Sequence, residues 1–286
     1  MVIERVAVTG ACGRLARYVI KCLASKVDQR LVDVALPKVD PGFMFYRADI
    51  NQPASLVGSF DHCDAVVHLA AKDLSTNASD EEYLTTNVIG TWNVCTAAAQ
   101  AGVGKLIHIS STAVLGLYDS QASEPIYLPI DEQHPSFATR PYGVSKLLGE
   151  KVAAAFSRQE LDIVCLRLPM VAFPSEIEGM AAAARDLNEP RLFCYVAPED
   201  VAQAVLHALD FERGGWSVFN VSAADSYGTL PTLDMLARVH GKLPEVRNLK
   251  CFDDAPRASI IDIEAAKRDL GFVPKFCWSQ LTNGIN

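Results

Sequence analysis

Tyr142 and Lys146 stand four residues apart and are the side chains best suited to moving a proton. Pro141 before them suits the first turn of a helix, on which residues four apart share one face. An ammonium beside a phenol stabilises the phenolate, which should lower the pKa of the tyrosine from about 10 toward neutrality. Such a phenol can exchange a proton with a carbinol, although Tyr-x-x-x-Lys alone more often marks an ordinary amphipathic helix.

Hydroxyl side chains precede this pair at the end of a strand expected over residues 105–110. They belong to Ser110, Ser111 and Thr112. Because ligands of open α/β sheets bind at the carboxyl ends of strands, a hydroxyl there can hold a substrate oxygen for the tyrosine. The alternative is that these residues only cap a turn.

The segment Thr9–Ala16 has the composition of a phosphate-binding turn. Gly10 and Gly13 let backbone N–H groups point at a phosphate where a helix begins, with no Cβ in the way. Ala16 is small enough for the helix to pack closely on the strand. Its position between the first strand and the first helix favours a nucleotide site over a merely structural turn.

An acid near the end of the second expected strand, Asp33, bears on the choice of cofactor. A carboxylate there accepts hydrogen bonds from a ribose 2′-OH and repels a 2′-phosphate, so we expect NAD and disfavour NADP. The alternative is an ordinary surface acid, and Arg14 or Lys38 could reverse the preference.

Strands and helices alternate through the first 168 residues. Strands are expected over residues 6–8, 30–36, 44–46, 65–69, 105–110 and 163–168, and helices over 15–25, 87–101 and 141–156. Nearly all-apolar strands separated by helices indicate a parallel sheet covered on both faces. Right-handed crossovers then give an α/β fold of the Rossmann type, with a doubly wound parallel sheet.

The pattern changes after Pro169. Helices are expected over residues 180–184 and 199–209 and a strand over 216–221, and beyond 226 Asp262 can cap a helix that stops at Gly271. We therefore expect a Rossmann domain for NAD over residues 1–168. Residues 169–286 would form mostly a small C-terminal lobe for the substrate, with roughly 195–222 returning to the sheet.

The composition excludes several classes of protein. The formal net charge of −8 leaves no basic excess for a phosphate backbone, so no nucleic-acid partner is expected. No run of about 18 apolar residues and no secretory pattern are present, which predicts a cytoplasmic protein without a membrane span. Eight scattered cysteines without a Cys-x-x-Cys pair predict free thiols and no metal site.

Together these motifs resemble the extended short-chain dehydrogenase/reductase superfamily of NAD-dependent sugar epimerases, dehydratases and dehydrogenases. The resemblance covers nearly the whole chain. It rests on the Thr9–Ala16 turn, Asp49-Ile50, residues 68–71 (His-Leu-Ala-Ala), residues 87–91 (Asn-Val-Ile-Gly-Thr), Ser110-Ser111, Tyr142 with Lys146, residues 166–169 (Leu-Arg-Leu-Pro), and the later segments 199–202 and 219–221.

The resemblance implies roles for the matching positions. The catalytic residues would be Ser111, Tyr142 and Lys146, since the family serine lies four residues before the position of Leu115. The cofactor would be bound by Gly10, Cys12, Gly13, Arg14, Leu15, Asp33, Asp49, Ile50, Leu69, Ala70, Ala71, Asn87, Tyr142, Lys146 and Pro169. The substrate would be bound by Lys72, Ser111, Thr112, Tyr142 and Arg167. His68, on a buried strand, is expected to be a core residue without a catalytic role.

Two positions after the serine bear on the reaction. Family dehydratases carry Asp-Glu where this chain has Thr112-Ala113, and the related 3,5-epimerase/reductases carry a cysteine at the first of them, so both activities are disfavoured. The small C-terminal lobe resembles that of uronate dehydrogenases, although these carry Asn-His at the same two positions. We expect an oxidoreductase of a sugar, sugar acid or small polyol. The alternatives are a nucleotide-sugar 4-epimerase and, less favoured, a dinucleotide-binding sensor without turnover.

The helices over residues 87–101 and 141–156 bear on assembly. Such folds commonly pair these two helices across a two-fold axis, and their alanine-rich faces allow close approach. A homodimer is therefore expected by family analogy. The alternative is that the same faces merely cover the sheet.

Overall fold

The computed structural model describes residues 2–40, 42–117, 124–158, 161–185 and 192–283. Contacts within it divide the chain into two compact units, neither of which is continuous in sequence. The first, here called the sheet unit, comprises Met1–Ser110, Pro141–Leu166 and Ala202–Val218. The second unit comprises Ser111–Arg140, Arg167–Val201 and Phe219–Asn286. The functional division expected at residue 168 stays a prediction.

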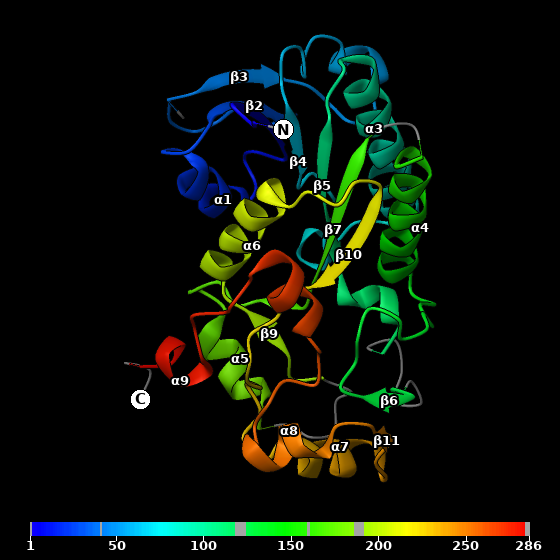
Figure 1. The fold of residues 1–286 in the computed structure, drawn as a ribbon, viewed down its shortest axis with the longest axis vertical. Coiled ribbons are helices and arrows are strands. Elements are labelled where there is room, and N and C mark those ends of the chain that lie inside the picture. Colours follow the sequence, from blue (N-terminus) through cyan, green and yellow to red (C-terminus); the bar gives the residue numbers. More distant parts are fainter. Residues whose placement is uncertain (1, 41, 118–123, 159–160, 186–191, 284–286) are drawn as a thin grey trace. The chain divides into compact units, whose positions relative to one another are not determined.

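The central element is a seven-stranded sheet (Figure 1). Its strands lie in the order β10 (Trp216–Asn220), β7 (Asp162–Leu168), β5 (Lys105–Ser111), β4 (Ala65–His68), β1 (Arg5–Thr9), β2 (Asp28–Asp33) and β3 (Met44–Arg47). From β1 the chain first runs outward through β2 and β3 and then returns to β4 on the other side, so the order reverses between β1 and β4. This confirms the expected Rossmann-type, doubly wound parallel sheet, in which the reversal point is the usual place for a ligand.

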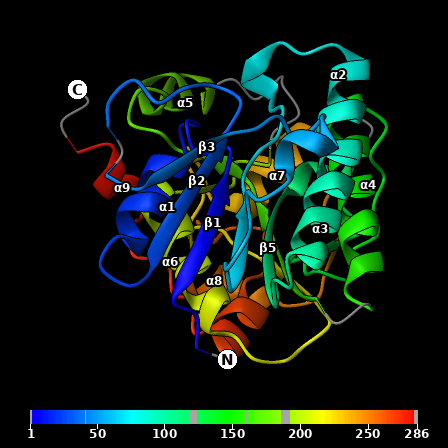
Figure 2. The ribbon, with the colours of Figure 1, turned by 90° about the horizontal axis from the view of Figure 1, so that it is seen from above.

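Apolar strands make the sheet a buried layer. Val6, Ala7 and Val8 of β1 are completely buried, and β1 pairs in parallel with β2 on one side and β4 on the other. Figure 2 shows α1 (Ala16–Leu23) and α6 (Pro198–Asp210) on one side of the sheet and α3 (Gly90–Gln100) and α4 (Pro141–Phe156) on the other. Strands covered on both faces need apolar side chains on both faces, which is why the sequence shows apolar runs there.

Several boundaries differ by a few residues from the sequence-based prediction, and two of these differences have a local cause. The second strand ends at Asp33 rather than at residue 36, because the Asp33 carboxylate accepts the N–H of Ala35 at 2.8 Å and turns the chain. The helix expected to begin at residue 87 is preceded by α2 (Asp80–Leu84), whose first turn is capped reciprocally by Ser79 and Glu82. A π-helical turn over Thr85–Ile89 connects α2 to α3.

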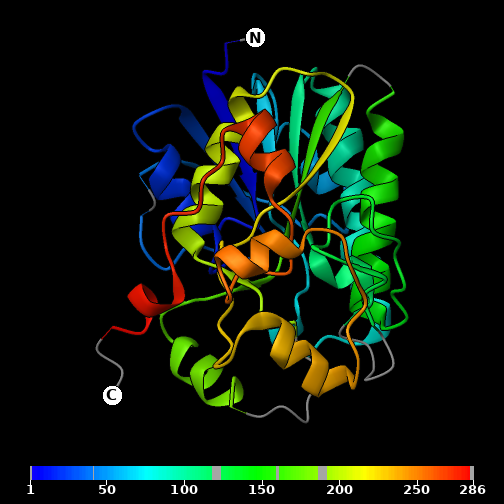
Figure 3. The same ribbon diagram turned by 60° about the horizontal axis from the view of Figure 1, so that its bottom comes forward.

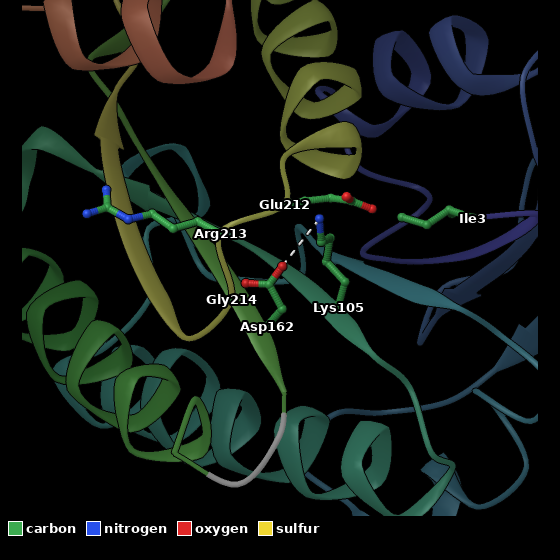
Figure 4. Close-up of a pocket in the computed structure, with 6 residues that line it drawn as sticks. All are labelled: Ile3, Lys105, Asp162, Glu212, Arg213 and Gly214. Carbon is green, nitrogen blue, oxygen red and sulfur yellow. Dashed lines mark ion pairs between the residues drawn. The ribbon is translucent and has the colours of Figure 1, made fainter. Parts of the chain in front are cut away.

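At the amino-terminal edge of the sheet, a buried ion pair joins β5 to β7. The Lys105 ammonium lies 3.3 Å from the Asp162 carboxylate (Figure 4) and donates to the carbonyl oxygens of Leu209, at 3.0 Å, and Phe211. These carbonyls end α6, so the ammonium also caps the negative end of that helix. A cavity of about 370 Å³ lies beside the pair, at the edge of the sheet opposite to the carboxyl ends.

The second unit contains two short parallel pairs, β6 (Tyr127–Leu128) with β11 (Glu245–Val246) and β8 (Met170–Val171) with β9 (Tyr195–Val196). Its helices, seen in light green, orange and red in Figure 3, are α5 (Ile177–Ala183), α7 (Thr232–His240), α8 (Leu249–Asp254) and α9 (Trp278–Leu281).

The core of the second unit is aromatic and is organised around one carboxylate. Asp225 accepts the hydrogen bond of the Tyr195 hydroxyl at 2.6 Å and that of the Trp278 N–H at 2.9 Å.

The helix expected after Asp262 is also present, since Asp262 accepts the N–H of Glu264 at 2.7 Å and Gly271 ends the helical segment in a left-handed conformation. None of the helices in the described ranges is long and apolar enough to cross a membrane.

Candidate active site

A cavity of about 520 Å³ lies at the carboxyl ends of the strands around β1 in the sheet unit. The predicted residues that line it are Gly10, Cys12, Gly13, Asp33, Asp49, Ile50, Leu69, Ala70, Ala71 and Lys72. The lining residues that were not predicted are Val32, Val34, Ala35, Ala48, Asn51, Thr76 and Thr86. Most of these are chain neighbours of predicted ones, but Thr76 carried no sequence signal because a loop brings it to the cavity.

The first position of the turn after β1, Gly10, requires glycine. Its φ is +70°, and a Cβ there would lie 2.7 Å from the backbone nitrogen and Cα of Ala70. The N–H of Ala70 in turn donates to the Thr9 hydroxyl at 3.3 Å. The turn and the end of β4 therefore lie backbone against backbone, and because Gly10 and Ala70 both line the cavity, a side chain at position 10 would push two parts of its lining apart.

Asp33 faces this turn from the end of β2. Its carboxylate accepts the N–H of Cys12 at 2.9 Å, in addition to that of Ala35. Two backbone amides thus fix the side chain in the cavity lining, where a carboxylate suits the hydroxyls of a ribose. Partial burial, together with the negative charge of Asp33, raises the pKa of the Cys12 thiol, which keeps this exposed cysteine protonated.

The loop after β4 closes one side of the cavity, and we call residues 71–77 the wall segment. Asp73, in this segment, lies 3.7 Å from the Arg14 guanidinium, which also donates to the Ser75 hydroxyl at 3.3 Å. Arg14 therefore ties the glycine turn to the wall segment. Neither Arg14 nor Leu15 is part of the cavity lining itself.

Asn87 connects the wall segment to helix α4. Its amide group accepts the N–H of Lys72 at 2.8 Å and donates to the carbonyl of Lys72 at 3.0 Å. The same amide donates to the Ser145 hydroxyl at 2.9 Å, which donates to the Tyr142 carbonyl at 2.8 Å. Asn87 is buried and lies outside the cavity lining, so its geometry suits positioning of the cavity wall relative to Tyr142.

Lys146 is the most perturbed cation of the site. The residue is only 6% exposed, and its ammonium donates to the Ile109 carbonyl at 2.6 Å. Burial lowers the pKa of Lys146 to about 8, against a smaller opposing effect from negative groups such as Glu150. Tyr142 lies one helical turn earlier on the same face of α4 and is partly exposed.

His68 is a core residue, as its strand position predicts. Its Nδ1 pairs with the Thr9 hydroxyl at 2.8 Å and its Nε2 with the Thr91 hydroxyl at 3.1 Å. Since Thr91 donates its own proton to the carbonyl of Asn87 at 2.7 Å, Nε2 of His68 must carry the ring proton. Complete burial, reinforced by the charge of Lys146, lowers the pKa of His68 to about 3 and keeps the ring neutral.

The remaining predicted residues belong to the second unit. Ser111 accepts the N–H of Ala113 at 3.1 Å and so caps the short 3₁₀ helix that begins at Thr112, which is buried. Arg167, 8% exposed, donates to the carbonyl of Glu132 at 3.2 Å, and Pro169 is buried. Most of the predicted cofactor residues lie around one cavity, and Asn87 links its wall to α4, although neither Tyr142 nor Lys146 is part of the lining. The approach of Ser111, Thr112, Arg167 and Pro169 to them stays a prediction.

Known proteins resemble this chain in sequence. Residues 6–222 match the model of the NAD dependent epimerase/dehydratase family. L-arabinose 1-dehydrogenase (NAD(P)(+)) of Haloferax volcanii is 28% identical over 213 residues, covering 72% of this chain and 82% of that protein. UDP-glucose 4-epimerase of Lacticaseibacillus casei is 27% identical and covers 95% of this chain and 92% of its own.

A solved structure, MoeE5 in complex with UDP-glucuronic acid and NAD, has the same fold. It superposes with a TM-score of 0.72 over 97% of this chain and 99% of its own, at 23% identity. The fold and the family resemblance inferred from the motifs are therefore confirmed.

Proposed function

Because the chain belongs to the NAD-dependent epimerase/dehydratase family, we propose that it is a dehydrogenase that oxidises a carbinol of a sugar, sugar acid or small polyol. NAD is the cofactor of this family. The observation that carries the proposal is the buried ammonium of Lys146 on the helical face it shares with Tyr142. A protein that only sensed the dinucleotide would have no need of a phenol and a buried ammonium on one helical face.

The residues lining the cavity fit the cofactor. Gly10 and Gly13 line the cavity, where backbone amides of their turn would bind the pyrophosphate, and Asp33 would accept the adenosine ribose hydroxyls. Asp49 and Ile50 would flank the adenine. When bound, NAD supplies an acceptor for the hydrogen on the carbinol carbon.

The protein's own part is to handle the hydroxyl proton. Tyr142 would take this proton as its phenolate, and the Lys146 ammonium would favour that phenolate and bind the nicotinamide ribose. Ser111 would hold the substrate oxygen, with Lys72, Thr112 and Arg167 as further substrate contacts. Since the pKa of Lys146 is about 8, its side chain is still mostly charged at neutral pH, as this role requires.

A nucleotide-sugar 4-epimerase is the second candidate function. It is favoured by the alignment with the UDP-glucose 4-epimerase over nearly the full length of both chains. The same proton transfer would begin that reaction, and a 4-epimerase needs no further acid or base. Thr112 and Ala113, in place of the Asp-Glu of dehydratases, support both candidates over dehydration.

One experiment separates the candidates. The protein is incubated with NAD and, in parallel, with free uronates, aldoses and UDP-sugars, while the absorbance of reduced cofactor and the product stereochemistry are followed. Net reduced cofactor with a free sugar is expected. An inverted UDP-sugar without net reduced cofactor would establish the epimerase instead, and neither change with any sugar would contradict both.

We further propose that the protein is a homodimer that pairs through α3 and α4. Trp92 on α3, Leu148 on α4 and Ile89 just before α3 are 50%, 40% and 53% exposed, so both helices present apolar side chains that such a pairing could bury. Light scattering after gel filtration should give twice the chain mass, and Trp92→Glu should halve it. A wild-type protein of single chain mass would refute the dimer.

The cytoplasm is the proposed location. All eight cysteines lie in the described ranges, none of them forms a disulfide there, and four are buried. Thiols persist in a reducing compartment, which supports this proposal. Fractionation of cells with an antibody against the protein should recover it with the cytosol, and recovery from a secreted fraction would contradict the assignment.

A further inference from the structure

Tyr83, on α2, is a buried aromatic residue to which the proposed chemistry gives no task. It is 8% exposed and carries a phenol that reaches away from its own helix. Its helix packs against α4, the helix that carries Tyr142 and Lys146 (Figure 2). A buried tyrosine between two segments can contact one of them through its ring and the other through its hydroxyl.

The ring of Tyr83 contacts the ring of Tyr142. The two centroids are 5.7 Å apart and the planes meet at 61°, which is the edge-to-face arrangement that aromatic pairs prefer. Tyr142 begins α4 and is partly exposed, so its side chain has room to change rotamer. The buried ring of Tyr83 opposes such a change because leaving it would cost an aromatic contact.

The hydroxyl of Tyr83 contacts the wall segment. It donates to the carbonyl of Asp73 at 3.3 Å, an oxygen that also accepts the N–H and the hydroxyl of Thr76 at 3.1 and 2.6 Å. Thr76 lines the cofactor cavity, and the Asp73 carboxylate is the partner of Arg14 in the glycine turn. One side chain therefore touches both the cofactor wall and the proposed proton carrier.

We propose that Tyr83 is a positioning residue, which holds the Tyr142 ring in its working orientation and couples that orientation to the wall segment of the cofactor cavity. This inference rests on the proposed function of Tyr142. In this role Tyr83 acts through Tyr142 and not on the substrate itself. The coupling means that order imposed on the wall segment by a bound dinucleotide also restrains the phenol of Tyr142.

Two substitutions separate the ring from the hydroxyl. Tyr83→Leu removes both, and Tyr83→Phe removes only the hydroxyl. Leu84→Ala is the matched control, because Leu84 is the next residue of the same helix and is 41% exposed. Each variant is measured for its urea midpoint, its NAD affinity, its kcat with the sugar found for the wild type, and the pH at which Tyr142 ionises. The last is read as ultraviolet difference absorption against the same variant carrying Tyr142→Phe.

Tyr83→Leu should move the ionisation of Tyr142 to higher pH, because a mobile phenol spends less time beside Lys146. It should also lower kcat about three- to tenfold, the size of one aromatic contact. Tyr83→Phe should leave that ionisation and kcat close to those of the wild type but weaken NAD binding about threefold, as expected for one neutral hydrogen bond. Leu84→Ala should change none of these quantities.

A purely structural role would lower the urea midpoint without moving the ionisation of Tyr142. That result for Tyr83→Leu overturns the proposal, as does an equal shift in Tyr83→Phe. Should Tyr83→Leu fail to fold, Tyr83→Phe decides alone, and wild-type NAD affinity in that variant overturns the coupling. The NAD affinity and the ionisation of Tyr142 can be measured without turnover. A failure to find any sugar substrate would therefore contradict the proposed function but would leave the test of Tyr83 intact.

Discussion

Lys146→Met should abolish activity and at the same time make the protein more stable at neutral pH. The Lys146 side chain is buried, and burial lowers its pKa from 10.5 to about 8. The charged form is therefore less favourable in the folded protein than in the unfolded chain. Methionine has a similar length and no charge, so it removes that cost together with the ammonium that Tyr142 needs.

The magnitude of this change in stability follows from the pKa of Lys146 and from the hydrogen bond that its ammonium donates to Ile109. A difference of about 2.5 pKa units corresponds to roughly 3 kcal/mol of folding free energy at neutral pH. Against this, the Ile109 carbonyl loses its donor, which costs about 1 to 2 kcal/mol. The variant should therefore be more stable than the wild type by about 1 to 2 kcal/mol at pH 7.

The pH dependence of the stability difference between Lys146→Met and the wild type is a second test of its sign. The cost of the charged lysine is fully present below pH 8 and is relieved as pH rises through 8 toward 10.5, where the unfolded chain also loses the proton. Urea unfolding of both proteins without cofactor, at pH 7 and at pH 10, measures this difference directly. The advantage of Lys146→Met should shrink or reverse at the higher pH.

Two results would refute this reasoning. One is a Lys146→Met protein that is less stable than the wild type at pH 7. The other is a stability difference that does not change between the two pH values. Either would mean that the ammonium is well solvated or well paired in the folded protein, and that the site is not built at a cost in stability.

Three further variants test other parts of the account. Asp33→Ser should weaken NAD binding about tenfold and reduce the ratio of NAD affinity to NADP affinity, because the carboxylate that repels a 2′-phosphate is gone. Parallel titrations measure this ratio, and an unchanged ratio would contradict the role of Asp33. Gly10→Ala should lose calorimetrically detectable NAD binding, because its Cβ would meet Ala70 at 2.7 Å, and wild-type affinity would rule out this cavity as the cofactor site. Lys105→Met should lower the free energy of unfolding by about 3 to 5 kcal/mol in urea, since the Asp162 carboxylate, whose side chain is only 18% exposed, loses its partner. Its kcat should stay at the wild-type value because the pair lies at the opposite edge of the sheet, and a tenfold fall in kcat of the folded variant would contradict that separation.

The sheet was predictable from sequence because its signals are local. Runs such as Val6-Ala7-Val8 are apolar on both faces, and Pro141 marks the start of α4, which ends at Phe156 as expected. The end of β2 was not predictable in the same way, because the carboxylate of Asp33 stops the strand by taking the amide of Ala35. Such a turn depends on a side-chain rotamer that strand propensity does not encode.

More residues of the cofactor part of the site than of the substrate part could be predicted from the sequence. Gly10 and Asp33 follow a spacing along the chain, and both line the cavity. Thr76 reaches the cavity through a loop, and Tyr83 contacts the ring of Tyr142, which is far away in sequence. No sequence motif predicts either contact. The site roles assigned to Ser111 and Arg167 stay predictions, because their described contacts are with their own unit.

The central claim is that the phenol of Tyr142 carries the proton while NAD is bound next to it. The most direct test compares kcat of the wild type with that of Tyr142→Phe on the same sugar, with NAD affinity measured for both. Tyr142→Phe should bind NAD within about threefold of the wild-type affinity and show a kcat lower by about 10² to 10⁴. Full turnover by Tyr142→Phe would contradict the claim.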